Sequence, residues 1–390
     1  MIKLYTDRYI LTPGPTEIPL RIKLALMKET TNPDLDPEFL TIYNETRDML
    51  RKILGVYKGS VYIMTGEAML GLEAAVANTV RNGTKVLVVA NGVFGEGFID
   101  LVRAYGGEPI SVETCEECWR RSADPSLIDR VLEKHKDIEV ITLVHCDTPS
   151  AILNNLEEVG KIAREHGSLL IVDAVSSIGG VSINFNETNI GILIGGSQKV
   201  LNTPPGLTIM AISDQAWERI EEVNYRGFYL DIKTWKYMLD DKGIFPYTVS
   251  DVLVYALRES LSMIIEEGPE NVYRRHEIAK KASWAALEVL NLKPYPLSIE
   301  YSSPTVTAFE TPSGVNELEL RKLMWEKYGV MIAGSWGRLQ GRVLRIGHMG
   351  VQASRTHVIT AFTTLAKAMS DLGFNVNKAR LIEAIEEVFK

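Results

Sequence analysis

Short apolar segments alternate with helix-like segments through the first half of this 390-residue chain. Seven of the apolar segments have the length of strands: residues 61–64, 85–90, 109–112, 139–144, 169–172, 190–194 and 207–211. Strands that alternate with helices join in parallel, and a parallel sheet is buried on both faces. The sequence therefore predicts an α/β fold with a mostly parallel seven-stranded sheet that helices cover on both faces.

The C-terminal third of the chain follows a different pattern. Residues 213–292 are mostly helical in pattern, and short strands alternate with helices after them. The expected strands are residues 305–309, 330–332 and 343–346, and the expected helices are residues 315–328 and 353–372. We therefore expect a large domain of residues 15–268 and a smaller α+β domain built from residues 1–14, as an N-terminal arm, and residues 269–390.

Composition and charge exclude several classes of protein. The net charge of −8 argues against a general nucleic-acid or anionic-membrane surface, because both favour clustered Lys and Arg. No apolar run approaches the roughly 18 residues of a membrane span. The first residues, Met1–Arg8, lack the apolar core of a secretory signal. We therefore expect a cytoplasmic protein with no nucleic-acid or membrane partner.

The three cysteines are too few for a disulfide scaffold. Cys115 and Cys118 form a single CxxC motif, without the second pair or the histidines of a zinc site. A redox pair, half of a zinc site and two incidental thiols are all compatible with it. Incidental thiols are the interpretation that a single motif favours, and a local disulfide stays open.

The apolar run at 190–194 ends in two glycines and then in Ser197, Gln198 and Lys199. The preceding strand, residues 169–172, ends in Asp173. In parallel sheets, ligands bind beyond the carboxyl ends of the strands, so both side chains are expected at one edge. A lysine amine for a Schiff base and an anion for a pyridinium nitrogen are what a pyridoxal 5′-phosphate (PLP) enzyme requires.

Three further polar or aromatic clusters follow predicted strands. Residues 67–69 open a helix, whose free N–H groups attract a phosphate. Phe94 has the flat face that stacks on a ring, and Thr148 has a hydroxyl for the ring oxygen. Taken singly, each of these clusters is more readily explained as a capped turn, a packed aromatic residue or a plain loop.

Together these motifs resemble the class V aminotransferases, and within them the serine–pyruvate and alanine–glyoxylate branch. The motifs that carry the resemblance occur in the family's order along the whole chain: Pro13-Gly14-Pro15-Thr16, Gly66-Glu67-Ala68-Met69, Asp173-Ala174-Val175-Ser176-Ser177, Gly196-Ser197-Gln198-Lys199, Pro204-Pro205-Gly206 and Leu344-Arg345-Ile346-Gly347. The resemblance implies the aspartate-aminotransferase fold, which is PLP fold type I, and a homodimer whose active sites are shared between subunits.

The resemblance also implies a role for each matching residue. Lys199 would form the Schiff base with PLP, and Asp173 would pair with the pyridinium N–H. The other implied cofactor contacts are Glu67, Ala68, Met69 and Gln198 around the phosphate, Phe94 on the ring face, and Thr148 and Ser176 beside the ring. No metal site is expected.

The same resemblance implies which residues bind the substrate and which residues reach the active site of the partner subunit. Arg345 and Gly14 would bind the substrate, with the guanidinium of Arg345 clamping a carboxylate. Tyr247 and Thr248 would reach the phosphate of the partner's cofactor. The sequence departs from the branch at the stacking ring, which is often Trp, and at Phe245, which lacks the expected hydroxyl.

Several other classes of protein lack the residues or the spacing that they require in this sequence. Gly195–Val200 lacks the glycine spacing and the final Ser or Thr of a P-loop, and Gly92–Gly97 reverses the spacing of a dinucleotide-binding fingerprint. A cysteine desulfurase needs a cysteine in the smaller domain, and none follows Cys146. A non-catalytic binding protein would have no reason to combine this lysine, aspartate and arginine.

The resemblance therefore implies a transaminase that moves an amino group from serine or alanine to pyruvate or glyoxylate. Substrates of this kind are the only partners expected besides a second copy of the chain. An aminotransferase or lyase of the same family that acts on aspartate or 2-aminoethylphosphonate stays open, because the same lysine and aspartate serve all of them.

Overall fold

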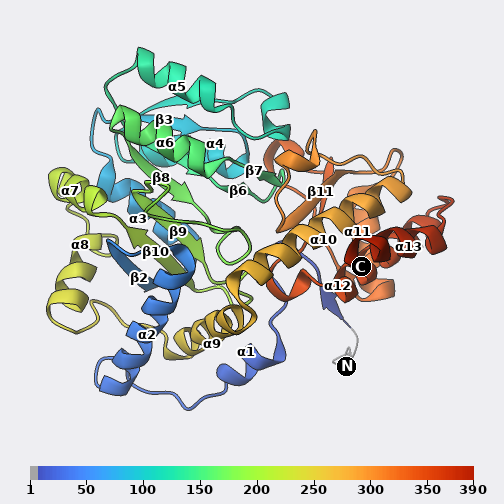
Figure 1. Ribbon diagram of the computed structural model, residues 1–390, viewed down its shortest axis with the longest axis horizontal. Helices are drawn as coiled ribbons and strands as arrows, with labels where there is room; N and C mark the ends of the chain where they lie inside the picture. Colours follow the sequence, from blue (N-terminus) through green and yellow to red (C-terminus); the bar gives the residue numbers. More distant parts are fainter. Residues whose placement is uncertain (1–7) are drawn as a thin grey trace.

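A seven-stranded sheet forms the centre of the computed structural model, which describes residues 8–390 (Figure 1). Across the sheet the strands lie in the order β2 (Ser60–Thr65), β10 (Leu207–Ile212), β9 (Ile192–Gly196), β8 (Leu169–Asp173), β5 (Ile138–Val144), β3 (Lys85–Val89) and β4 (Glu108–Val112). Only β10 runs antiparallel to its neighbours. The predicted α/β fold with a mostly parallel seven-stranded sheet is confirmed.

Helices from the first two thirds of the chain pack around this sheet (Figure 1). They are α1 (Leu20–Ala25), α2 (Pro37–Leu54), α3 (Ala68–Thr79), α4 (Val93–Ala104), α5 (Pro125–Lys134), α6 (Leu156–His166), α7 (Asp214–Val223), α8 (Ile232–Trp235) and α9 (Asp251–Glu267). Every residue of β8, β9 and β10 is buried. Strands with no exposed face must be apolar throughout, which is why these segments are continuous apolar runs.

The C-terminal elements gather around a second hydrophobic cluster, coloured orange and red in Figure 1. They are α10 (Pro269–Val289), β11 (Val306–Glu310), α11 (Glu317–Tyr328), β12 (Val330–Met331), β13 (Val343–Gly347), α12 (Arg355–Asp371) and α13 (Lys378–Phe389). Strands β11 and β13 pair in antiparallel fashion. The separate cluster agrees with an additional α+β layer, and the domain boundaries at residues 14 and 268 stay a prediction.

The N-terminal segment joins the C-terminal elements to the central sheet. Strand β1 (Tyr9–Ile10) pairs in parallel with β12, and Leu11 is fully buried in the second hydrophobic cluster. Further along, the hydroxyl of Thr16 donates to the carbonyl of Lys199 over 3.0 Å. The predicted arm is therefore present from residue 8 onward, and residues 1–7 lie outside the described part of the chain.

No helix among residues 8–390 is long and apolar enough to cross a membrane. The expectation of a cytoplasmic protein stays a prediction.

Candidate active site

The parallel strands end at one edge of the sheet and deliver the predicted site residues there. Strand β8 ends at Asp173, and the residue that follows β5, His145, donates its backbone N–H to the carbonyl of Asp173 over 2.8 Å. Strand β9 ends at Gly196, three residues before Lys199. Side chains from three neighbouring strands thus meet at the carboxyl edge, where open parallel sheets bind ligands.

The Lys199 side chain lies against the N-terminal segment. Its Nζ donates to the carbonyl of Pro13 over 2.9 Å. Gly14 has a φ of +105°, and a Cβ at this position would lie 2.7 Å from Nζ, so only glycine leaves room for the lysine. Burial, together with the nearby positive charge of Arg345, lowers the pKa of Lys199 to about 8.

Asp173 is a buried carboxylate with one partner. Its Oδ1 accepts from the backbone N–H of Val175 over 2.9 Å, and Oδ2 accepts from no residue within 8–390. Burial raises the pKa of Asp173 to about 7, and the neighbouring carboxylate of Asp147 adds to the rise. A cation beside Oδ2 would restore the charged form.

Asp147 is a residue that the sequence analysis did not single out, although it lies in the loop that contains Thr148. It is buried, and burial raises its pKa. Its carboxylate accepts from the backbone N–H of Phe94 over 2.9 Å and from the hydroxyl of Ser150 over 2.7 Å. Asp147 therefore holds the N-terminus of α4, which carries the half-buried ring of Phe94.

Thr148 and Ser176 lie together at the same edge. Both are buried, and their hydroxyl oxygens are 3.4 Å apart. Ser176 belongs to the turn that follows Asp173, and Thr148 follows Asp147 directly. The structure thus brings the two predicted hydroxyls next to the predicted carboxylate.

The start of α3 and the side chain of Gln198 form a second part of the site. Glu67 is the N-cap residue of α3, its side chain makes no capping hydrogen bond, and it is exposed. A Cβ on Gly196 would lie 2.9 Å from Oε1 of Gln198 and 3.0 Å from Cβ of Ala68, so Gln198 lies close to the helix start. Within residues 8–390, Oε1 of Gln198 is buried and has no partner. Met69, next along the helix, is 43% exposed.

Uncapped backbone N–H groups at the start of α3 are suited to an anion such as the phosphate of PLP, whereas the unpaired Oε1 of Gln198 is suited to a donor. The partly unpaired Asp173 carboxylate is suited to a protonated ring nitrogen, and Lys199 is suited to an aldehyde carbon. The residues present therefore fit PLP, except that the carboxylate of Glu67 has the wrong sign for a phosphate.

Arg345 on β13 approaches the same site from the C-terminal elements. It is 5% exposed, and its Nε donates to the carbonyl of Gly334 over 2.6 Å. Burial lowers the pKa of Arg345 to about 10. Its guanidinium carbon is 5.8 Å from the ring of Trp336, which meets the ring of Phe94 edge-on at 5.7 Å. Trp336 therefore bridges the predicted substrate residue and the predicted stacking residue.

Tyr247 and Thr248 are not brought to Lys199 of the same chain. The hydroxyl of Tyr247 donates to the carbonyl of Phe228 over 2.7 Å. Thr248 is exposed, and its carbonyl accepts from the hydroxyl of Thr65 at the end of β2 over 3.4 Å. Their predicted role at a partner's phosphate stays a prediction.

The comparisons with known proteins agree with this geometry. A family model described as aminotransferase class V matches residues 8–341. The chain is 34% identical to a pyridoxamine–pyruvate transaminase of Mesorhizobium japonicum, over 96% of this chain and 94% of the relative. It is 32% identical to a serine–glyoxylate aminotransferase of Methylorubrum extorquens, over 88% and 86%. A crystal structure of ureidoglycine–glyoxylate aminotransferase from Bacillus subtilis matches with a TM-score of 0.93 at 28% identity, covering 99% of each chain.

The lowered pKa of Lys199 is testable by reductive methylation of the apoprotein at a series of pH values. Because only the neutral amine reacts, the rate at Lys199 should rise with pH and be half-maximal near pH 8. Lys85 is the matched control, since its ion pair with Asp137 raises its pKa above the ordinary 10.5. Peptide mass spectrometry follows both sites, and a half-maximal rate at Lys199 above pH 10 would contradict the assignment.

Proposed function

The chain belongs to the class V aminotransferase family and is a PLP-dependent transaminase of fold type I, and from this premise we propose that it moves the amino group of a small L-amino acid to a 2-oxo acid. The donor we propose is serine or alanine, and the acceptor is pyruvate or glyoxylate. The observation that carries the proposal is the Lys199 amine, with its pKa near 8, at the same sheet edge as Asp173 and within the electrostatic influence of Arg345.

When bound, PLP supplies an electrophilic carbon and a ring that withdraws electrons from the substrate. We propose that Lys199 holds the cofactor covalently and is displaced by the substrate amine. The freed lysine, whose pKa is lowered from its ordinary value toward neutral pH, then moves a proton at the substrate Cα. Asp173 would keep the ring nitrogen protonated, because a cation beside this buried carboxylate stabilises its charged form.

We propose the remaining cofactor contacts from where each residue lies at the sheet edge and from the chemical groups of its side chain or backbone. Phe94 would stack on the ring, and Thr148 and Ser176 would donate to its oxygen side. The backbone N–H groups of residues 67–69 and the side-chain NH2 group of Gln198 would donate to the phosphate.

The substrate side is proposed to consist of Gly14 and Arg345. The buried guanidinium of Arg345 has one described hydrogen bond, from Nε to Gly334, which leaves its terminal nitrogens for a bidentate carboxylate. The names of the relatives include pyruvate or glyoxylate as acceptors, which supports an acceptor of this size. Aspartate and 2-aminoethylphosphonate stay open as alternative donors.

Glu67 favours a second candidate function, in which free pyridoxamine is the amino donor. A phosphate carries a charge of about −1.5 to −2 near pH 7, so a carboxylate at the N-cap of α3 disfavours it. The neutral hydroxymethyl group that replaces the phosphate in pyridoxamine would instead donate to Glu67. One relative is named a pyridoxamine–pyruvate transaminase, which supports this candidate.

We also propose a homodimer with shared active sites. Large apolar side chains are exposed on two segments of the described chain: Leu20, Leu24, Met27 and Leu35 on one segment, and Phe228, Tyr229, Tyr237 and Ile244 on the other. Apolar patches of this kind favour a protein partner. Tyr247 packs on Phe228 at this patch, which supports its proposed reach into a partner's site.

The proposed reaction predicts two separable half-reactions. Adding L-serine or L-alanine to the PLP-loaded protein without an acceptor should replace the visible absorbance band with a near-ultraviolet band, and pyruvate or glyoxylate should restore it. Lys199→Ala should bind PLP and lose turnover by at least about a thousandfold, as expected when the nucleophile and base are lost together. A visible band that no amino acid changes would contradict the proposed donors, and ammonia release without an acceptor would indicate a lyase.

The second candidate function predicts that Glu67 discriminates between PLP, which has a phosphate group, and pyridoxamine, which has a hydroxymethyl group at that position. The wild-type protein should convert pyridoxamine and pyruvate into pyridoxal and alanine. Glu67→Gln should raise the affinity for PLP by about tenfold and lower kcat/KM for pyridoxamine by a similar factor, as one charge-assisted hydrogen bond is gained or lost. Glu73→Gln on the same helix is the matched control. Equal affinities for PLP in the wild-type and Glu67→Gln proteins would contradict this role of Glu67.

The shared site predicts complementation between inactive chains. Light scattering should give twice the chain mass of 43.5 kDa. Lys199→Ala and Tyr247→Asp proteins should each be nearly inactive, and their mixture after subunit exchange should regain activity, because one site of the mixed dimer then has both native residues. A monomeric mass, or no recovery in the mixture, would contradict the shared site.

A further inference from the structure

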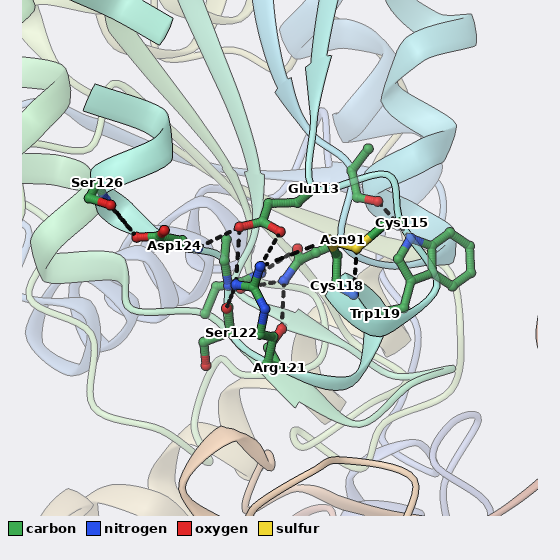
Figure 2. A network of polar contacts seen from close by, with 12 residues as sticks. Asn91, Glu113, Cys115, Cys118, Trp119, Arg121, Ser122, Asp124 and Ser126 are labelled. Carbon is green, nitrogen blue, oxygen red and sulfur yellow. Dashed lines mark hydrogen bonds and ion pairs between the residues drawn. A yellow bond between two sulfur atoms is a disulfide. The ribbon is translucent and has the colours of Figure 1, made fainter. Parts of the chain in front are cut away.

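The segment of residues 113–121, here called the disulfide loop, lies between β4 and α5 and contains both cysteines of the CxxC motif. Cys115 and Cys118 are bonded to each other, so the expectation of two incidental thiols is wrong (Figure 2). The ring closed by this bond contains only Glu116 and Glu117 between the cysteines. Cys115 is exposed, and Cys118 is 7% exposed. The disulfide is thus reachable from solvent on one side and packed on the other.

On its packed side, the disulfide loop forms hydrogen bonds with Ala90 and Asn91, in the segment that leads into the active site. The indole Nε1 of Trp119 donates to the carbonyl of Ala90 over 2.8 Å, and the amide of Asn91 donates to the carbonyl of Arg121 over 3.2 Å (Figure 2). Ala90 and Asn91 directly precede the start of α4, which carries Phe94. The loop therefore stabilises the segment that positions the N-terminal end of α4.

A small apolar cluster joins the loop to both the sheet and the C-terminal elements. Cys118 and Trp119 pack in it with Cys146 beside the active site and with Leu339 and Val343 from the C-terminal elements. The disulfide loop therefore lies at the contact between the two parts of the fold.

Arg338 connects the loop to the substrate side of the active site. Its guanidinium carbon lies 4.7 Å from the ring of Trp119, and it donates to the carbonyl of Thr114 over 3.1 Å. It also forms an ion pair with Glu96 on α4. Two residues earlier in the chain, Trp336 contacts Phe94 and the guanidinium of Arg345. The contacts of Arg338 and the short backbone segment from Trp336 to Arg338 thus connect the disulfide loop with Trp336.

We propose that the Cys115–Cys118 disulfide, acting through the positioning residue Arg338, holds Trp336 against Arg345, so that reduction of the disulfide weakens binding of the 2-oxo acid substrate. The proposal rests on the proposed function, because it takes Arg345 as the carboxylate-binding residue. Closing a loop with a disulfide restricts the conformations of the chain that it spans. Without the bond, the loop that contains Thr114 and Trp119 is held less firmly, although Trp119 keeps its hydrogen bond to Ala90. Arg338 keeps its ion pair with Glu96, and the acceptor and the ring on its other side are less well fixed.

The redox step is an ordinary thiol–disulfide exchange with a dithiol. A thiolate of the dithiol attacks the exposed Cys115 sulfur, and the bond to Cys118 breaks. The second thiolate of the dithiol then closes its own disulfide and releases Cys115. Two electrons and two protons pass to the protein, which ends with two thiols, and the dithiol ends as a cyclic disulfide.

The test compares the oxidised holoenzyme with the same protein after dithiothreitol treatment, with mass spectrometry reporting the thiol state. KM for pyruvate or glyoxylate should rise about tenfold on reduction, at the scale of an ordinary coupling between two sites, and kcat should change less than about threefold. The Cys115→Ser/Cys118→Ser double variant should have the higher KM in both conditions. Arg338→Ala should also have the higher KM without a redox response, and Arg338→Lys should restore part of the affinity.

Hydrogen exchange gives a readout that does not depend on turnover. Backbone amides of residues 334–340 should exchange faster in the reduced protein and in the double variant. An unchanged KM together with unchanged exchange after complete reduction would overturn the proposal, as would two free thiols after aerobic incubation of the native protein. If neither redox state transaminates, the proposed function fails, and the exchange of residues 334–340 alone decides the coupling: faster exchange supports it and equal exchange overturns it.

Discussion

Removal of Lys199 and Asp173 from water is the constraint on which the rest of the site depends. Desolvation disfavours the charged form of each group, so the pKa of the amine falls to about 8 and that of the carboxyl rises to about 7. The two side chains are held in place because Asp173 ends β8 and Lys199 lies three residues after β9, and both strands are buried along their whole length. The same desolvation brings an amine and a carboxyl into the range where proton transfer near neutral pH is effective.

The features that the sequence predicted well are those that depend on burial and on strand direction. A strand covered on both faces has to be apolar throughout, so β8, β9 and β10 are recognisable as continuous apolar runs. Parallel strands end at one edge, so a lysine after β9 and an aspartate at the end of β8 are brought to the same edge of the sheet. The closeness of Thr148 to Ser176 follows from the same rule, because β5 and β8 are neighbours.

Contacts between distant segments of the chain could not be predicted in this way. Arg338 and Glu96 are 242 residues apart, and no local pattern connects them. Asp147 was visible as a polar residue after a strand, but its support of Phe94 depends on where α4 begins. The disulfide depends on the turn between β4 and α5, which brings two cysteines together that a CxxC spacing alone leaves undecided.

The two parts of the fold carry different parts of the chemistry. Lys199 and Asp173 are fixed on the central sheet, whereas Arg345 lies on β13, a strand of the C-terminal elements. If Arg345 binds the substrate as proposed, substrate binding depends on how the second part sits against the first, and the charge of Arg345 also contributes to the lowered pKa of Lys199. Similar relatives have names with different amino donors but the same kinds of acceptor. Such variation is compatible with one fixed set of reacting groups, because the residues that meet the donor can change without disturbing the strands that hold the lysine.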